Sequence, residues 1–169
     1  MTNIIIGLGN PGKEFDKTYH NLGFMAIDLI ADHLSLVFSK KTKNAIYCEG
    51  NINGKKVILV KPQTYMNLSG EAVAIFKSKY KDANIIVICD DIDLPKGTVR
   101  FRVNGSGGTH NGLRNIVSHI GQDFARVKIG CGRDEKMDLA DYVLSKIRDE
   151  EFLKDALLQA KNKTLENLL

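Results

Sequence analysis

The chain has 169 residues, of which 43% are hydrophobic and 26% are charged, with a net charge of +4. This composition is typical of a globular protein with a proper core, and it excludes a disordered tail or a scaffold. The charge permits a polyanionic partner without requiring one. We expect residues 1–169 to form a single domain that acts as a monomer, without an obligate protein partner.

Six segments with apolar and β-branched residues are predicted to be strands: residues 3–8, 45–51, 56–61, 84–89, 97–103 and 125–131. Asn53-Gly54, between the second and third of them, is typical of a tight hairpin turn. Apolar residues at helical spacing lie between the strands: Phe24, Ile27, Ala31 and Leu34; Ala72, Ile75, Phe76 and Tyr80; Leu113, Ile116, Val117 and Ile120.

Gly121 is placed to end the third helix, and a last helix is expected within residues 148–169. Strands that alternate with helices predict an α/β sandwich, in which helices flank a central mixed, mostly parallel sheet. The hairpin supplies an antiparallel part of that sheet.

The cysteines and the N-terminus indicate where the chain works. Cys48, Cys89 and Cys131 stand singly in apolar runs, so we expect buried, reduced thiols. The N-terminus enters a strand at once, without the pattern of a signal peptide, and no run approaches the length of a membrane span. These features predict a cytoplasmic protein that does not contact membranes.

The first strand runs into Gly7-Leu8-Gly9-Asn10-Pro11-Gly12, which has the glycine spacing of a dinucleotide-binding turn. In that motif the third glycine lies in a helix and an acidic residue ends the next strand. Here a polar segment without helical periodicity follows Gly12, and Asp32, at the right distance, falls within a helix. The sequence favours another use for this turn. A nucleotide-dependent enzyme remains an alternative that rests on the glycines alone.

Polar residues gather where predicted strands end and helices begin: Asn10, His20 and Asn21; Tyr65, Met66 and Asn67; Asp90, Asp91 and Asp93; His110 and Asn111. Because the loops at the carboxyl ends of strands form the binding sites of α/β sheets, we expect these groups to converge on one cleft. Each asparagine alone has an ordinary explanation, Asn21 and Asn67 as helix caps and Asn111 as a turn residue. His33 and His119 lie within helices and receive no role.

The residues of this cleft bear on three kinds of chemistry. The run Asp90-Asp91-Ile92-Asp93 offers metal ligands together with His20 and His110, but neighbouring strand residues point to opposite faces, which disfavours a shared ion. Ser106 lacks the sequence context of a nucleophile elbow. A histidine that activates water, oriented by a carboxylate, remains, with Asp90 the natural partner of His20.

Basic residues also occur in local pairs. Two pairs have the i, i+2 spacing that puts both cations on one face of a strand: Arg100 with Arg102, and Arg126 with Lys128. Each pair fits a solvated strand face as well as it fits contact with phosphates.

Four blocks of the chain, GLGNPGKEFDKTYHNLGF, VKPQTYMNLSG, DDIDLPKG and GSGGTHNGLRNI, resemble the bacterial-type peptidyl-tRNA hydrolase family in order and interval. The resemblance covers nearly the whole chain. It implies an esterase that cleaves the bond between a peptide and the 3'-terminal ribose of tRNA, without metal or cofactor, and recycles tRNA from stalled translation. It also implies that Asn10 is carried into a catalytic cleft by the first turn.

The resemblance also implies roles for individual residues. His20 would be the general base for the attacking water, and Asp90 would orient it. Asn10 would contact the peptide end, and Asn67 and Asn111 would hold the substrate and the water. Three side chains would line the path of the peptide and the terminal adenosine: Phe15, Tyr65 and Met66.

Three further positions have supporting roles in this comparison. Arg102 and Lys128 match positions near tRNA phosphates. His110 either contacts the substrate or buttresses the loop that presents Asn111, and we favour buttressing.

The chain departs from the family pattern at four positions, Phe15, Tyr19, Cys89 and Thr109, none of which removes a catalytic group. The main rival hypothesis is a non-catalytic, RNA-binding relative. The combination of His20, Asp90 and the three loop asparagines Asn10, Asn67 and Asn111 argues against it, since a binder has no need of a base.

Overall fold

The computed structural model describes all 169 residues and contains one seven-stranded sheet with the order β2-β3-β4-β1-β5-β7-β6. The strands are β1 (Thr2–Gly7), β2 (Lys40–Lys41), β3 (Ala45–Ile52), β4 (Lys55–Pro62), β5 (Asn84–Asp91), β6 (Val99–Arg102) and β7 (Ala125–Gly130). The four central strands β4, β1, β5 and β7 run parallel, and β2, β3 and β6 pair antiparallel at the two edges. The predicted mixed sheet is confirmed.

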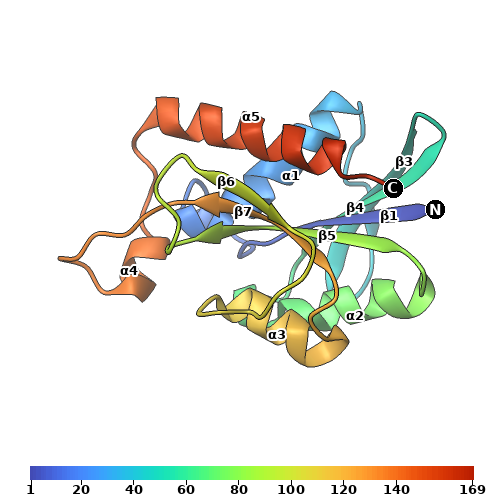
Figure 1. Ribbon diagram of the computed structural model, residues 1–169, viewed down its shortest axis with the longest axis horizontal. Coiled ribbons are helices and arrows are strands. Elements are labelled where there is room, and N and C mark those ends of the chain that lie inside the picture. Colours follow the sequence, from blue (N-terminus) through green and yellow to red (C-terminus); the bar gives the residue numbers. More distant parts are fainter.

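The helices are α1 (Leu22–His33), α2 (Ser69–Lys79), α3 (Asn111–Ile120), α4 (Leu139–Val143) and α5 (Glu150–Glu166). Three short 3-10 turns precede helices or follow strands: η1 (Lys13–Phe15), η2 (Tyr19–Asn21) and η3 (Met66–Leu68). Figure 1 shows α1 and α5 on one face of the sheet and α2 and α3 on the other, which confirms the predicted α/β sandwich. No helix combines the length and the apolar character that crossing a bilayer requires.

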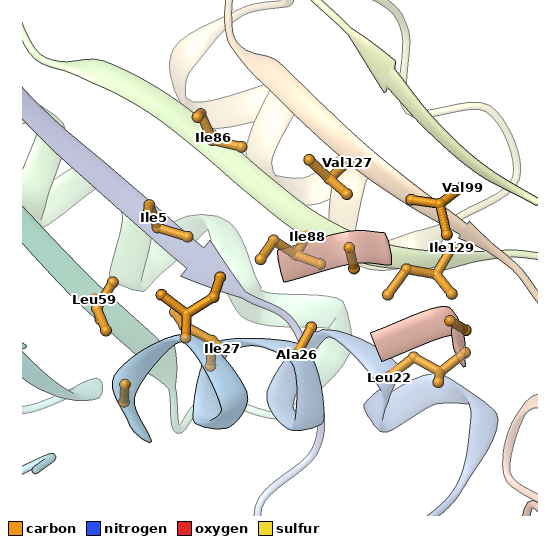
Figure 2. Packing of buried hydrophobic residues seen from close by; sticks show 14 of the residues in the cluster. Ile5, Leu22, Ala26, Ile27, Leu59, Ile86, Ile88, Val99, Val127 and Ile129 are labelled. Atoms are coloured by element: carbon orange, nitrogen blue, oxygen red, sulfur yellow. The ribbon is translucent and has the colours of Figure 1, made fainter. Parts of the chain in front are cut away.

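The core has two layers, one on each face of the sheet. Successive residues of β1 point to opposite faces, so Ile5 packs under α1 whereas Ile4 and Ile6 pack toward α2 and α3. In the first layer, Ile27 of α1 lies against strand residues such as Ile5 (Figure 2). Both faces of the central strands are covered, which explains why these strands read as continuous apolar runs.

Most predicted elements are confirmed within a few residues, and the exceptions have physical reasons. Asn53 and Gly54 both have positive φ angles, 51° and 79°, as a two-residue hairpin turn requires. The set of buried residues predicted for α2 is wrong at Ile75, whose side chain is 41% exposed. Val73 is buried on that helix in its place. Helix α4 and strand β2, with five and two residues, are too short to give a periodic signal. The three cysteines are buried and unpaired, as predicted.

The glycines of the first turn allow α1 to pack directly on the end of β1. A Cβ atom on Gly7 would lie 2.4 Å from the carbonyl oxygen of Gly23, and one on Gly9 would lie 2.5 Å from the ring of Phe24. A Cβ atom on Gly23 itself would lie 2.3 Å from the carbonyl oxygen of Ile88. Close helix–strand packing therefore explains the glycine spacing at Gly7 and Gly9. It also brings η2, which precedes α1, to the carboxyl end of β5.

We expect Gly23→Ala to destabilise the protein by about 1–3 kcal/mol, because the new methyl group meets backbone atoms that cannot rotate away. Thermal unfolding followed by circular dichroism measures the effect. Ser78→Ala, on the exposed side of α2, is the control and should change stability by less than about 0.5 kcal/mol. A Gly23→Ala variant that melts at the native temperature would contradict this account of the turn.

Candidate active site

A buried carboxylate at the end of β5 holds two histidines. The side chain of Asp90 is 2% exposed, and its Oδ2 lies 2.9 Å from Nδ1 of His20. Its Oδ1 lies 2.9 Å from Nε2 of His110, and the two imidazole rings are 5.0 Å apart. Sequence reasoning expected the pair His20–Asp90, and the structure adds His110 as a second partner of the same carboxylate.

His20 is presented by η2, which neighbouring side chains fix in place. Tyr19 is buried and its ring stacks on that of Tyr142 with centroids 4.7 Å apart. The backbone amide of Tyr19 donates to the carbonyl of Ser145. The segment that follows α4 thus packs against the turn that carries His20.

The environment of His110 determines its tautomer. This residue is the N-cap of α3, and its Nδ1 accepts a hydrogen bond from the backbone amide of Leu113 at 3.2 Å. Because Nδ1 is an acceptor, a neutral ring carries its proton on Nε2, which then donates to Asp90. If His20 donates from Nδ1 to the other oxygen of Asp90, its Nε2 keeps a free lone pair.

The spacing of these three side chains would also suit metal ligands. One potential ligand atom from each of His20, Asp90 and His110 lies within 4.8 Å of the other two. The tautomer of His110 works against coordination, since its protonated Nε2 has no lone pair to offer an ion. Asp91 and Asp93 do not join this cluster. Asp91 pairs with Lys128 at 3.7 Å, and Asp93 contacts Arg133.

The electrostatics of the cluster favour a charged carboxylate beside a basic imidazole. Burial alone would lower the pKa of His20, but the charge of Asp90 and their hydrogen bond outweigh it, so the pKa is raised above its ordinary value. Burial alone would raise the pKa of Asp90, but both histidines act against it and hold that pKa well below its usual range. Asp90 therefore remains ionised throughout the physiological range.

These groups open into a cleft of about 220 Å³ at the carboxyl end of the sheet. Asn111, Thr109 and Lys128 line it together with the three residues of the cluster. Helix α4 closes one side with Leu139, Ala140 and Val143. These apolar side chains were not predicted to line the cleft, because a helix of five residues is too short to show a periodic pattern in the sequence.

Asn10 is the centre of a second group beside the cleft. Its Oδ1 accepts from the backbone amide of Met66 at 2.6 Å. Its own backbone amide and carbonyl both bond to the carboxamide of Asn21, at 2.8 and 3.0 Å. Asn21 therefore ties two loops together. It holds the N-cap position of α1, as expected, but its side chain makes no capping hydrogen bond. The Nδ2 group of Asn10 makes no hydrogen bond within the protein and is free to donate to another molecule.

Aromatic residues border the Asn10 group. Tyr65 is 54% exposed and has a positive φ of 62°, a conformation that is strained for a side chain of its size. The rings of Phe15 and Tyr65 meet edge to face with centroids 6.3 Å apart. The structure thus brings together the residues expected to line the path of the peptide.

The two groups meet at the start of α3. A Cβ atom on Gly112 would lie 2.5 Å from Sδ of Met66 and 3.1 Å from the ring of His110, so this glycine permits their close packing. Asn67 and Asn111 are both exposed. Asn67 does not cap α2, since Leu68 holds that position, and Asn111 is the first residue of α3 and not a turn residue, so both interpretations are wrong.

Arg100 and Arg102 are both exposed on β6, as their spacing predicts, but the second basic pair is not. Arg126 is completely buried, so the interpretation of Arg126 and Lys128 as two cations on an exposed strand face is wrong. The covering loops and helix α3 bury that face of β7, which local spacing cannot reveal. Lys128 reaches the cleft, and Arg102 is exposed on the edge strand β6.

Comparison with known proteins shows the family. A family model described as peptidyl-tRNA hydrolase matches residues 4–169. The chain belongs to the peptidyl-tRNA hydrolase family. It is 51% identical to the peptidyl-tRNA hydrolase of Fervidobacterium nodosum over 88% of this chain and 78% of the relative. It is 44% identical to that of Clostridium novyi, over 98% of this chain and 90% of the relative.

Among solved structures, the peptidyl-tRNA hydrolase of Acinetobacter baumannii superimposes with a TM-score of 0.90 at 38% identity. The match covers 96% of this chain and 86% of that one. The four departures from the family pattern leave the cluster around Asp90 intact. Tyr19 and Cys89 are buried, Phe15 packs on Tyr65, and Thr109 faces the cleft without touching the His20–Asp90 pair.

Proposed function

We propose that this chain hydrolyses the ester between a peptide, or an N-blocked aminoacyl group, and the 3'-terminal ribose of tRNA, with His20 as the general base. Nε2 of His20 removes a proton from water as its oxygen attacks the ester carbonyl. Asp90 stabilises the imidazolium that forms. The tetrahedral intermediate then releases the ribose oxygen, which takes the proton, and the products are the peptide carboxylate and free tRNA.

One observation carries this proposal: a buried, ionised carboxylate bonds to the imidazole nitrogen opposite the one that must act as base. General-base assistance of this kind is worth roughly 10²–10⁴-fold in rate, which suits an ester better than an amide. The groups that take part all come from one chain, so a monomer suffices. The reaction would recycle tRNA from peptides released or stalled during translation.

The remaining polar residues would position the substrate. The free Nδ2 of Asn10 would donate to the peptide end, because its Oδ1 already bonds to Met66. Asn111, which lines the cleft, and Asn67, which is exposed on η3, would hold the substrate and the attacking water. Phe15 and Tyr65 offer aromatic faces to the peptide or to the terminal adenine.

Binding of the tRNA should depend on Arg102 and Lys128. We expect each of Arg102→Gln and Lys128→Gln to weaken tRNA binding and to reduce the slope of log K against log salt concentration by about 1. Lys163→Gln is the control, since Lys163 is exposed near the end of α5, and that end of the helix lies beside the two chain termini (Figure 1). Filter binding or fluorescence anisotropy over a salt series measures the slopes. Unchanged slopes in both variants would remove these residues from the tRNA surface.

Cleavage assays with two substrates in EDTA test the proposal. The native protein should cleave N-acetyl-aminoacyl-tRNA rapidly and leave unblocked aminoacyl-tRNA intact, because only the blocked group presents an amide to Asn10. Binding of tRNA without cleavage of either substrate would favour the non-catalytic, RNA-binding relative. Cleavage that stops in EDTA would overturn the metal-independent mechanism.

A further inference from the structure

One buried charge has no part in the proposed mechanism. Arg126 of β7 is 0% exposed, yet its guanidinium forms no ion pair with any carboxylate. The ring of Phe124 lies 4.1 Å from its central carbon. A buried cation without a charged partner is a poor source of stability, because removing it from water costs several kcal/mol. Its contacts must explain its place in the fold.

The guanidinium bonds to backbone carbonyl groups from two separate segments. Its Nη1 donates to the carbonyl of Ser106 at 2.7 Å. Its Nη2 donates to the carbonyls of Gln122 and Phe124 at 3.1 and 3.2 Å. The fixed planar fork of arginine suits this arrangement, since one side chain reaches acceptors in several directions, whereas a lysine ammonium is a single point charge.

These two segments are the loops at the two ends of α3. Ser106 belongs to the loop that leads into the helix, and Gln122 follows the end of the helix at Ile120. The amide of Gly105 also donates to the carbonyl of Gln122 at 3.3 Å, so the two loops contact each other at a carbonyl group that also accepts from the guanidinium. Arg126 thus links the loop before α3 to the loop after it through hydrogen bonds from one side chain.

The entry loop continues into the cleft. His110 caps α3 and bonds to Asp90, and Asn111 is the first residue of the helix. Gly107 and Gly108, which join Ser106 to these residues, line the cleft and include a glycine with a positive φ of 56°. Glycines permit several backbone conformations, so this loop needs an outside anchor to hold one of them.

We propose that Arg126 is a positioning residue, which anchors the loops around α3 and thereby sets where His110 and Asn111 stand relative to Asp90. This role rests on the proposed function of the cleft. Arg126 touches neither the substrate nor the reacting atoms. It differs from the surface cations because it would affect the rate of the chemical step and not the affinity for tRNA.

Arg126→Lys tests the proposal, with Arg148→Lys as the control, because Arg148 is exposed and makes no hydrogen bond or ion pair. Single-turnover cleavage of N-acetyl-aminoacyl-tRNA gives the rate, and anisotropy with uncharged tRNA gives the affinity and its salt slope. Hydrogen exchange of residues 104–113 reports the loop itself and does not depend on turnover. Phe124→Leu, which replaces the ring beside the guanidinium with another buried apolar side chain, gives a second measurement if Arg126→Lys does not fold.

We expect Arg126→Lys to lower the single-turnover rate by about 10- to 100-fold and to speed exchange in residues 104–113, as misplacement of catalytic groups predicts. The affinity for tRNA should stay within about twofold of native, as should all values for Arg148→Lys. Phe124→Leu should change rate and exchange in the same direction by less.

Three results would overturn the proposal. A native rate with a lowered melting temperature would make Arg126 structural only. A native rate with weaker tRNA binding and a smaller salt slope would make it a phosphate contact. Native exchange in residues 104–113 would show that it does not hold the loop. If the native protein failed to cleave the substrate, the proposed function would fall, while the exchange result would still test the anchor.

Discussion

His20→Ala should reduce the single-turnover rate of cleavage of N-acetyl-aminoacyl-tRNA by roughly 10²–10⁴-fold, because it removes the proposed general base. The fold should persist, since His20 lies on a 3-10 turn that the buried residues Tyr19 and Asn21 hold. Affinity for tRNA should be nearly native, because the residues proposed to contact the phosphates, Arg102 and Lys128, are unchanged. Rapid mixing with protein in excess over substrate separates the chemical step from binding and product release.

His33→Ala is the matched control for this experiment. His33 ends α1, is exposed and makes no side-chain hydrogen bond. Its loss should leave both the rate and the affinity within about twofold of native. A His20→Ala variant that cleaves as fast as the native protein would remove His20 from the mechanism.

Asp90→Asn should lower the rate by a similar factor, on the order of 10²–10⁴, although the changed side chain is of the same size. Asparagine can accept a hydrogen bond only through its oxygen, because its NH2 group is a donor, so at least one of the two hydrogen bonds that Asp90 accepts from the histidines is lost. It also supplies no negative charge to stabilise the imidazolium. The pH dependence of the single-turnover rate measures both consequences.

The direction of the pH effect follows from the pKa of His20. The base must be neutral, so activity falls as the pH drops through that pKa, which in the native protein is raised above about 6.5. In Asp90→Asn, burial acts on His20 without the opposing charge, so the pKa falls and the acid limb moves to lower pH. Asp82→Asn, at an exposed position, should shift nothing. If the single-turnover rate fell at the same pH in the native protein and in Asp90→Asn, the coupling of His20 to Asp90 would be contradicted.

Some of these features were readable from the sequence because they depend on local pattern. Alternating apolar strands and helices specify the sandwich, and parallel strands bring the loop after β1 and the end of β5 to the same edge. The pairing of His20 with Asp90 follows from that arrangement. The resemblance to a known family gave the residues their chemical roles.

Other features depend on contacts that no local pattern records. His110 was expected to buttress a loop, and its bond to Asp90 joins the start of α3 to the end of β5, two segments that only the tertiary fold brings together. Asn21 stands at the N-cap position of α1, but its side chain binds the backbone of Asn10 and not the helix. Arg126 has the spacing of a surface cation and is buried under loops from both ends of α3. In each case a tertiary contact overrides the local preference of the residue.

The most direct test of the central claim is single-turnover cleavage of N-acetyl-aminoacyl-tRNA by His20→Ala in EDTA, with increasing concentrations of imidazole. If His20 is the general base, the variant is slow without imidazole, and added imidazole restores cleavage in proportion to its neutral form while tRNA affinity stays native. If His20→Ala cleaves at the native rate without imidazole, the base lies elsewhere and the proposed mechanism is wrong.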